Sequence, residues 1–206
     1  MPLPSSTIKH DNTTVHPEQV DDYFKTLAAM VDKVVVDRNA SAKISLADGI
    51  SELMQSVQKS HEQGGKAIFV GNGGSAAIAS HIANDFSKNG GMRAICFSDA
   101  AQLTCLSNDY GYDQVYAKPI EMLAQPQDIL VAISSSGKSP NILNAVQAAT
   151  AKKCKIFTLS GFNSDNPLRT AGAVNFYVPS HSYGYVELTH MIICHAAVDF
   201  ICEVKK

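Results

Sequence analysis

The chain has 206 residues, 45% of them hydrophobic and 17% charged, and its formal net charge is −2. This length is sufficient for one domain with a buried core, and the composition is that of an ordinary globular protein. The small net charge excludes an electrostatic argument for binding nucleic acid or an anionic membrane. There is no run of about 18 apolar residues, as a transmembrane helix needs, and no signal-like N-terminus, so we expect a cytoplasmic protein.

The N-terminal quarter predicts an arm and two helices. Residues 1–16 are polar and contain proline, which is typical of a flexible arm. Residues 17–38 read as a helix, with Pro17 suited to its first turn. Residues 43–63 read as a second helix, because apolar residues recur along one face. These apolar positions are Ile44, Leu46, Ile50, Leu53, Met54 and Val57.

From residue 66 onward, short apolar runs alternate with helical patterns. The runs cover residues 66–72, 92–97, 128–134, 155–161 and 174–179. The helical patterns cover residues 75–88, about 101–107, 113–124, 140–153 and about 184–203. This alternation predicts one α/β domain, residues 17–206, with a parallel sheet covered by helices on both faces. Ligands of such sheets bind beyond the C-terminal ends of the strands.

The first polar loop at a strand end is GNGGS, residues 71–75. Glycines let a ligand approach the backbone closely, and the following helix directs its positive end at the loop. Both features favour an anion site. A tight turn with Ser75 as helix N-cap explains the same residues, and the spacing is wrong for a dinucleotide loop.

The second loop, SSSGKS, covers residues 134–139. It contains GKS, but a P-loop needs glycine five positions before Gly137, where the chain has Ala132. Ser139 suits the N-cap of the following helix and Pro140 its first position. Capping does not explain the three serines before Gly137, whose hydroxyls suit a phosphate at a helix N-terminus. These are Ser134, Ser135 and Ser136.

The third loop, SNDYG, covers residues 107–111 and places Asn108 and Asp109 between two helices. On their own, these two residues favour an Asx-turn. The five cysteines form an odd set without a CxxC pair, which predicts reduced thiols.

Two helices carry residues suited to acid–base or metal chemistry. His81 and Asp85 are four apart and lie on one helix face. Glu187 and His195 are eight apart on the last helix, and together the two pairs could hold one zinc ion. From the residues alone, however, His81 is better explained as a surface histidine, and His195 as a buried one bonded to a backbone carbonyl. His181 and His190 lie close by in the sequence, so a role for either stays open.

The chain contains GNGGS, then His81, then an Asn–Asp pair, then SSSGKS and finally a late histidine. This order of motifs resembles the sugar isomerase (SIS) domain family over nearly the whole chain. Within that family the pattern is similar to the phosphoheptose isomerases. The resemblance implies a flavodoxin-like, three-layer α/β fold with a five-stranded parallel sheet. It also implies that the two leading helices build a homotetramer whose active sites lie between subunits.

The resemblance further implies roles for individual residues. The sugar would contact Asn72, Gly73, Gly74, Ser75, Asp85, Asn108, Asp109 and Glu187. Ser134, Ser135, Ser136 and Ser139 would hold the phosphate. A zinc ion would bind His81, Asp85, Glu187 and His195. At two of these positions the chain departs from the family, with Asp85 where glutamate is usual and Glu187 where glutamine is usual.

The implied reaction interconverts sedoheptulose 7-phosphate and D-glycero-D-manno-heptose 7-phosphate through an enediolate. Such an isomerisation needs a base and an opposing acid. We assign these roles to Asp85 and His195, as a hypothesis. Two alternatives stay open: a non-catalytic sugar-phosphate binder, like the family members that associate with the replication initiator, and an isomerase of another ketose phosphate.

Overall fold

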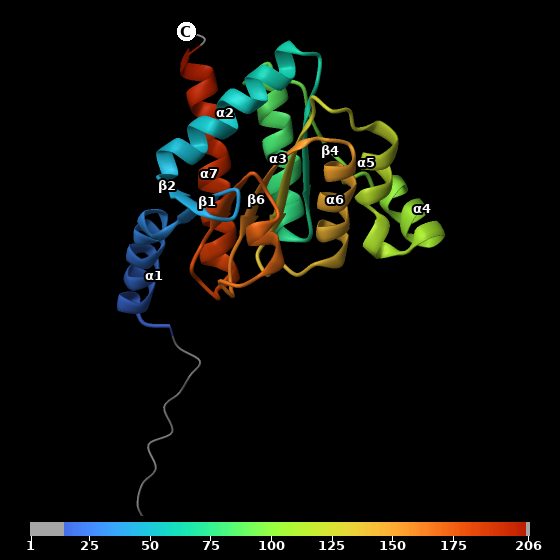
Figure 1. The fold of residues 1–206 in the computed structure, drawn as a ribbon. Helices are drawn as coiled ribbons and strands as arrows, with labels where there is room; N and C mark the ends of the chain where they lie inside the picture. The colour runs from blue at the N-terminus through green and yellow to red at the C-terminus, as the bar shows by residue number, and fades with distance from the viewer. Residues whose placement is uncertain (1–14, 205–206) are drawn as a thin grey trace, which may run out of the picture.

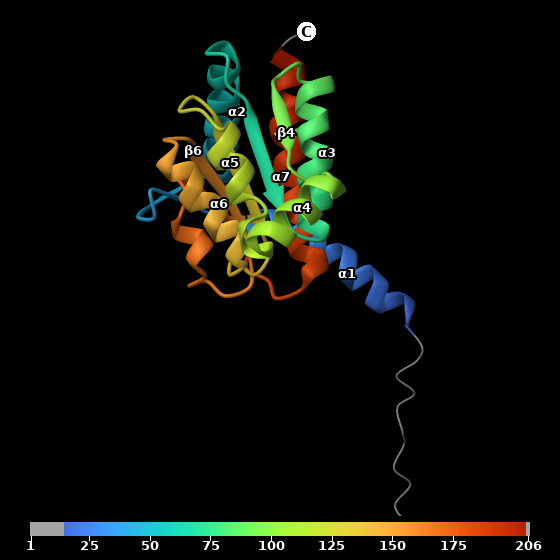
Figure 2. The same ribbon diagram turned by 90° about the vertical axis from the view of Figure 1, so that its right-hand side faces the viewer.

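The computed structural model describes residues 15–204, which form a seven-stranded sheet with helices on both faces (Figures 1 and 2). The strands are β1 (Val35–Arg38), β2 (Ala42–Ile44), β3 (Ala67–Gly71), β4 (Ala94–Cys96), β5 (Ile129–Ser134), β6 (Lys155–Ser160) and β7 (Val174–Tyr177). Their order is β2-β1-β7-β6-β5-β3-β4. The five strands β3 to β7 are parallel, as predicted, but β1 and β2 add an antiparallel edge, so the sheet has seven strands and not the five expected.

The helices are α1 (Pro17–Met30), α2 (Leu46–Glu62), α3 (Gly74–Lys88), α4 (Ala100–Tyr110), α5 (Ala117–Leu123), α6 (Pro140–Ala151) and α7 (Tyr183–Val204). Three short 3₁₀ helices lie in connections between these elements: η1 (Val31–Lys33) between α1 and β1, η2 (Tyr112–Gln114) between α4 and α5, and η3 (Pro167–Thr170) between β6 and β7. Residues of α2, α3 and α7 share one core cluster, and residues of α4, α5 and α6 share another. The predicted three-layer α/β class is therefore confirmed.

Side chains of the central strands alternate between the two core clusters, one on each face of the sheet. Along β3, Ala67 and Phe69 belong to the cluster with α2, α3 and α7, whereas Ile68 and Val70 belong to the cluster with α4, α5 and α6. Successive side chains of a strand point to opposite faces, so a strand buried on both faces reads as a continuous apolar run. All five residues of β3 are buried.

The predicted helix at residues 17–38 was too long. Helix α1 ends at Met30, and after η1 the chain continues as β1, which pairs antiparallel with β7 and with β2. Three consecutive valines, residues 34–36, favour extended backbone because β-branched side chains are stiff in a helix. Asn39 and Ala40 then adopt φ values of 49° and 57° in the turn to β2.

The second predicted helix, 43–63, begins later than expected. Ile44 lies in β2, and α2 starts at Leu46 after Ser45, whose hydroxyl accepts a hydrogen bond from the Asp48 amide. This is a standard N-cap, which fixes the start of the helix. Most of the predicted N-terminal arm, residues 1–14, lies outside the described residues.

Helix α7 is long and apolar enough to cross a membrane by length and composition. Part of its apolar surface is used inside the domain: Ile193, Ala197, Val198 and Ile201 are buried in the core cluster shared with α2 and α3, whereas Leu188, Ile192 and Phe200 are exposed. A helix that is apolar around most of its circumference is typical of a buried core element.

Candidate active site

A pocket of about 280 Å³ opens at the C-terminal ends of β3 and β5. Strand β3 has β4 on one side and β5 on the other, so the pocket lies where the strand order reverses, the usual ligand site of such sheets. The pocket is lined by Asn72, Gly73, Gly74, Ser75, Ser134, Ser135, Ser136, Ser139, Tyr183 and Glu187. The structure thus brings together the residues predicted from GNGGS and SSSGKS, and adds Glu187 from α7.

The GNGGS loop needs its glycines for two reasons. Gly73 has φ 55° and ψ −122°, a conformation that side chains disfavour. A Cβ on Gly74 would overlap the carboxylate of Glu187, so the bare backbone permits a close approach between α3 and α7. Gly73 is the N-cap of α3 and Ser75 lies inside the helix, buried. The alternative in which Ser75 caps the helix is therefore wrong.

The serine loop holds several hydroxyls at the N-terminus of α6. Ser139 is the N-cap of α6, but its side chain makes no capping bond and instead lies 3.3 Å from the Ser134 hydroxyl. Ser134 accepts a hydrogen bond from the Gly137 amide and Ser136 one from the Lys138 amide. The buried Ser135 hydroxyl has no partner within residues 15–204. A buried hydroxyl without a partner is costly, so this loop is suited to an added acceptor such as phosphate.

The SNDYG segment predicted that Asn108 and Asp109 lie in a loop, and this prediction is wrong. They form the last turn of α4, where the Asn108 amide donates to Asp109, and neither residue lines the pocket. Tyr112, which follows this segment, contacts the pocket indirectly: its hydroxyl donates to Asn72, a residue of the pocket lining, at 3.1 Å. A substrate role for Asn108 and Asp109 stays a prediction.

Sequence reasoning missed two further residues close to this pocket. Tyr183, the first residue of α7, lines the pocket, and Asn141, in the first turn of α6, exchanges hydrogen bonds with Asn72. The only sequence signal for Asn141 was its place directly after Ser139 and Pro140. No periodicity distinguishes Tyr183 from an ordinary surface tyrosine.

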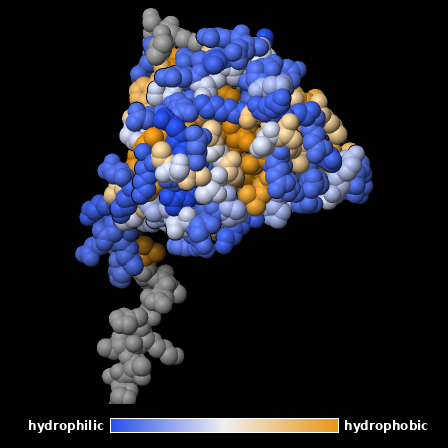
Figure 3. Space-filling model, viewed as in Figure 1, coloured by the Kyte–Doolittle hydropathy of each residue, from blue (hydrophilic) through white to orange (hydrophobic). Residues whose placement is uncertain are grey.

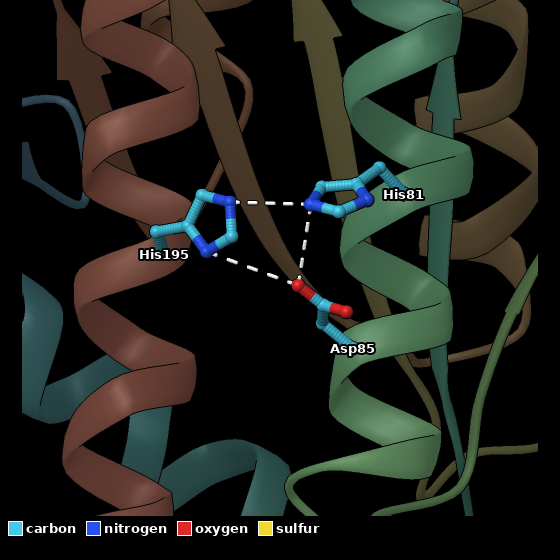
Figure 4. A group of neighbouring side chains, drawn as sticks. All are labelled: His81, Asp85 and His195. Atoms are coloured by element: carbon cyan, nitrogen blue, oxygen red, sulfur yellow. Dashed lines mark hydrogen bonds and ion pairs between the residues drawn. The ribbon is translucent and has the colours of Figure 1, made fainter.

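The side chains of His81, Asp85 and His195 converge between α3 and α7 (Figure 4). The Nε2 atom of His81 lies 3.2 Å from Nε2 of His195 and 3.2 Å from Oδ2 of Asp85. Nδ1 of His195 lies 3.9 Å from the same carboxylate oxygen. Both rings are partly exposed, whereas the Asp85 side chain is 13% exposed. We call these three residues the His–Asp–His cluster.

Donor types and spacing in the His–Asp–His cluster fit a zinc ion. Bonds of about 2.0–2.1 Å in a tetrahedral site place neighbouring ligand atoms roughly 3.3 Å apart, close to the two 3.2 Å separations found here. Three protein ligands would leave one coordination position open, as in catalytic zinc sites. Glu187, the fourth predicted ligand, is outside this group and lines the pocket instead.

The pocket and the cluster belong to the same pair of helices. His195 follows Glu187 by eight residues on α7, which corresponds to roughly 12 Å along the helix axis. His81 follows Ser75 by six residues on α3, or roughly 9 Å. Because α3 and α7 pack side by side, the cluster in Figure 4 lies between the same two helices that contribute Ser75 and Glu187 to the pocket.

His190 is the buried histidine bonded to a backbone carbonyl that the residues alone predicted at His195. It is wholly buried, and its Nε2 lies 3.1 Å from the carbonyl oxygen of Ser160. Burial lowers the pKa of His190 from 6.5 to about 4, while the hydrogen bond to Ser160 opposes this shift. His190 is therefore neutral inside the folded protein at neutral pH.

We expect acid to destabilise the fold through His190. Between pH 6.5 and about 4 the unfolded chain binds a proton that the folded protein does not, so stability falls as the pH drops through this window. The loss is on the order of 3 kcal/mol. Urea unfolding at pH 7 and pH 4.5 should show a smaller acid-induced loss for His190→Gln than for the wild type. The exposed His181→Gln serves as control, and equal losses in all three proteins would contradict the assignment.

Known proteins match the chain over most of its length. A family model described as SIS domain matches residues 22–161. A phosphoheptose isomerase of Thiobacillus denitrificans is 35% identical over 184 residues, covering 82% of this chain and 93% of that protein. Among solved structures, a phosphoheptose isomerase from Francisella tularensis has a TM-score of 0.78 at 29% identity, covering 92% of this chain and 100% of that chain.

A phosphoheptose isomerase from Neisseria gonorrhoeae has a TM-score of 0.76 at 28% identity, covering 89% of this chain and 98% of that chain. The similarity thus includes the GNGGS and SSSGKS loops, both of which fall inside the matched family region. The chain therefore belongs to the SIS domain family and is a relative of the phosphoheptose isomerases.

Proposed function

We propose that this protein is a phosphoheptose isomerase, an intramolecular oxidoreductase that converts sedoheptulose 7-phosphate to D-glycero-D-manno-heptose 7-phosphate for heptose precursors of lipopolysaccharide or capsule. The observation that carries this proposal is the His–Asp–His cluster lying along the same helix pair as a hydroxyl-lined pocket. The relatives that match most of the chain are phosphoheptose isomerases, which supports the same reaction.

The phosphate binds at the serine loop rather than at GNGGS. Both loops precede a helix N-terminus, where an anion is stabilised. At the N-terminus of α3, however, the carboxylate of Glu187 already lies against Gly74. A second anion there would be repelled, whereas the serine-loop residues that line the pocket at the α6 N-terminus contribute hydroxyls and no carboxylate. The sugar then extends from the serine loop towards GNGGS.

In the isomerisation, Asp85 acts as base and His195 as the opposing acid. The carboxylate removes the proton from C1 of the ketose while a ring N–H of His195 donates a proton to O2, which gives the enediol. Proton loss from O1 and proton return to C2 complete the aldose. A positioned acid or base typically contributes about 10²–10⁴-fold to such a step. The contacts between Asp85 and the two rings favour this pairing of roles.

Zinc is part of the proposal. His81, Asp85 and His195 would hold the ion, and Glu187 would contact the sugar. A bound zinc ion supplies Lewis-acid polarisation of the carbonyl and hydroxyl oxygens of the substrate. Asp85 is one methylene shorter than the glutamate usual at this position, which brings its carboxylate closer to α3. Metal content of the purified protein tests this assignment.

A homotetramer with active sites between subunits is also proposed. Large apolar side chains are exposed on the leading helix and on α7, namely Val20, Phe24, Leu188, Ile192 and Phe200. A further apolar groove of about 590 Å³ lies between α2 and α7, and Figure 3 shows hydrophobic residues exposed within a largely hydrophilic face. Such surfaces are typical of subunit interfaces. A cytoplasmic location, where the free cysteines stay reduced, completes the proposal.

An NMR assay with sedoheptulose 7-phosphate, with and without zinc, tests the function. Appearance of the aldoheptose 7-phosphate establishes the reaction. Absence of conversion, with the ketose still protecting the protein against thermal unfolding, would favour a binding protein or an isomerase of another ketose phosphate. The second of these alternatives is kept because Asp85 and Glu187 both depart from the family pattern.

We expect Ser136→Ala to weaken sugar-phosphate binding. Its hydroxyl lines the pocket, and loss of one hydrogen bond to a charged group costs about 1.5–3 kcal/mol, or roughly 10- to 150-fold in KM. The chemical step keeps its acid and base, so kcat should change little. Steady-state kinetics separate the two constants. An unchanged KM would show that the phosphate binds elsewhere.

A further inference from the structure

The side chain of Asn72 is held by residues from two other segments. The Asn141 amide donates to Oδ1 of Asn72 at 2.8 Å, and the Asn72 amide donates back to Oδ1 of Asn141 at 2.9 Å. The hydroxyl of Tyr112 donates to the same Oδ1 of Asn72 at 3.1 Å. Asn72 follows β3, Tyr112 lies in η2, and Asn141 lies in the first turn of α6. Three segments therefore meet at one amide.

These bonds fix which group Asn72 presents to the pocket. An amide oxygen accepts two hydrogen bonds, and both places on Oδ1 of Asn72 are taken, by Asn141 and Tyr112. The amide nitrogen has two protons, of which one is given to Asn141. One N–H of Asn72 is left for the pocket that this residue lines.

Asn141 itself is placed to act only through Asn72. It is 2% exposed and is not among the residues that line the pocket. A buried amide needs partners for its polar atoms, and the reciprocal pair with Asn72 supplies them. The pair also ties the GNGGS loop to the helix whose N-terminus carries the serine loop.

We propose that Asn141 is a positioning residue, which with Tyr112 holds the Asn72 amide so that its free N–H donates to an oxygen of the bound sugar phosphate. The identity of that ligand rests on the proposed function, whereas the orientation of Asn72 rests on the geometry alone. Without Asn141, the Asn72 side chain can rotate and present its oxygen, which repels the substrate oxygen.

A double-mutant cycle tests this proposal. Asn72→Ala and Asn141→Ala should each lower kcat/KM about 3- to 10-fold, as expected for one neutral hydrogen bond, mainly through KM. If Asn141 acts through Asn72, the double variant loses no more than Asn72→Ala alone. Losses that multiply in the double variant would overturn the proposal. Gln147→Ala, an exposed amide on the same helix, is the matched control and should match the wild type.

Two further measurements keep the test decisive if Asn141→Ala is unstable or the wild type is inactive. Tyr112→Phe removes one donor from a partly exposed ring, and its smaller loss should disappear in the Asn72→Ala background. Crystal structures of Asn141→Ala and Tyr112→Phe report the Asn72 orientation without any assay. If the Asn72 amide keeps its orientation in both variants, the positioning role is overturned. If Asn72 rotates in the variants but the wild type is inactive, only the proposed function is rejected.

Discussion

Asp85→Asn should reduce kcat about 10²–10⁴-fold while leaving KM within a few fold of the wild type. The amide keeps the size and the acceptor oxygen of the carboxylate, so the contact with His81 survives, but it cannot take a proton. The serine loop, which binds the phosphate, is untouched. Steady-state kinetics with sedoheptulose 7-phosphate measure both constants.

Two controls separate the base from other effects of this change. Asp32→Asn removes an exposed carboxylate in η1 and should match the wild type. His81→Gln removes one ring of the cluster but no carboxylate, so metal content and kcat in that variant show how much of the loss follows the ion. Turnover near the wild-type value in Asp85→Asn would contradict the assignment of the base.

Gly137→Ala should destabilise the fold by roughly 3–5 kcal/mol, about 6–20 °C in Tm for a domain of this size. Gly137 has φ 62°, where a side chain costs about 1–2 kcal/mol. An added Cβ would also overlap the Asn166 side-chain amide. Asn166 is 1% exposed, accepts a bond from the Arg169 amide and donates to the carbonyls of Gly161 and Asn163. Displacing it leaves buried groups without partners.

Gly64→Ala is the control for the cost of placing a side chain at a positive φ angle. Gly64 has φ 80°, but the nearest atom to an added Cβ belongs to the flexible Arg93 side chain at 3.5 Å. It should lose only about 1–2 kcal/mol. Thermal unfolding of both variants without ligand measures the difference. Equal losses would show that the overlap with Asn166 relaxes without cost.

The sequence determined the features that depend on local order along the chain. The five parallel strands were readable because each appears as a continuous apolar run between helical patterns. Four of them are almost wholly buried, and the edge strand β4 is partly buried. The GNGGS and SSSGKS loops were readable because glycine-rich and serine-rich turns at a strand end, directly before a helix, suit an anion site. Their common pocket followed from the rule that ligands bind beyond the C-terminal ends of parallel strands.

The tertiary structure decided the features that depend on partners far away in the chain. Residues 35–38 became a strand because β7 offered an edge to pair with, although the helix predicted from Pro17 extended to residue 38. His195 and His190 look alike in sequence, and only packing gave one an exposed place beside Asp85 and the other a buried place under Ser160. The partner of Asn72 lies 69 residues away, a contact that no local pattern encodes.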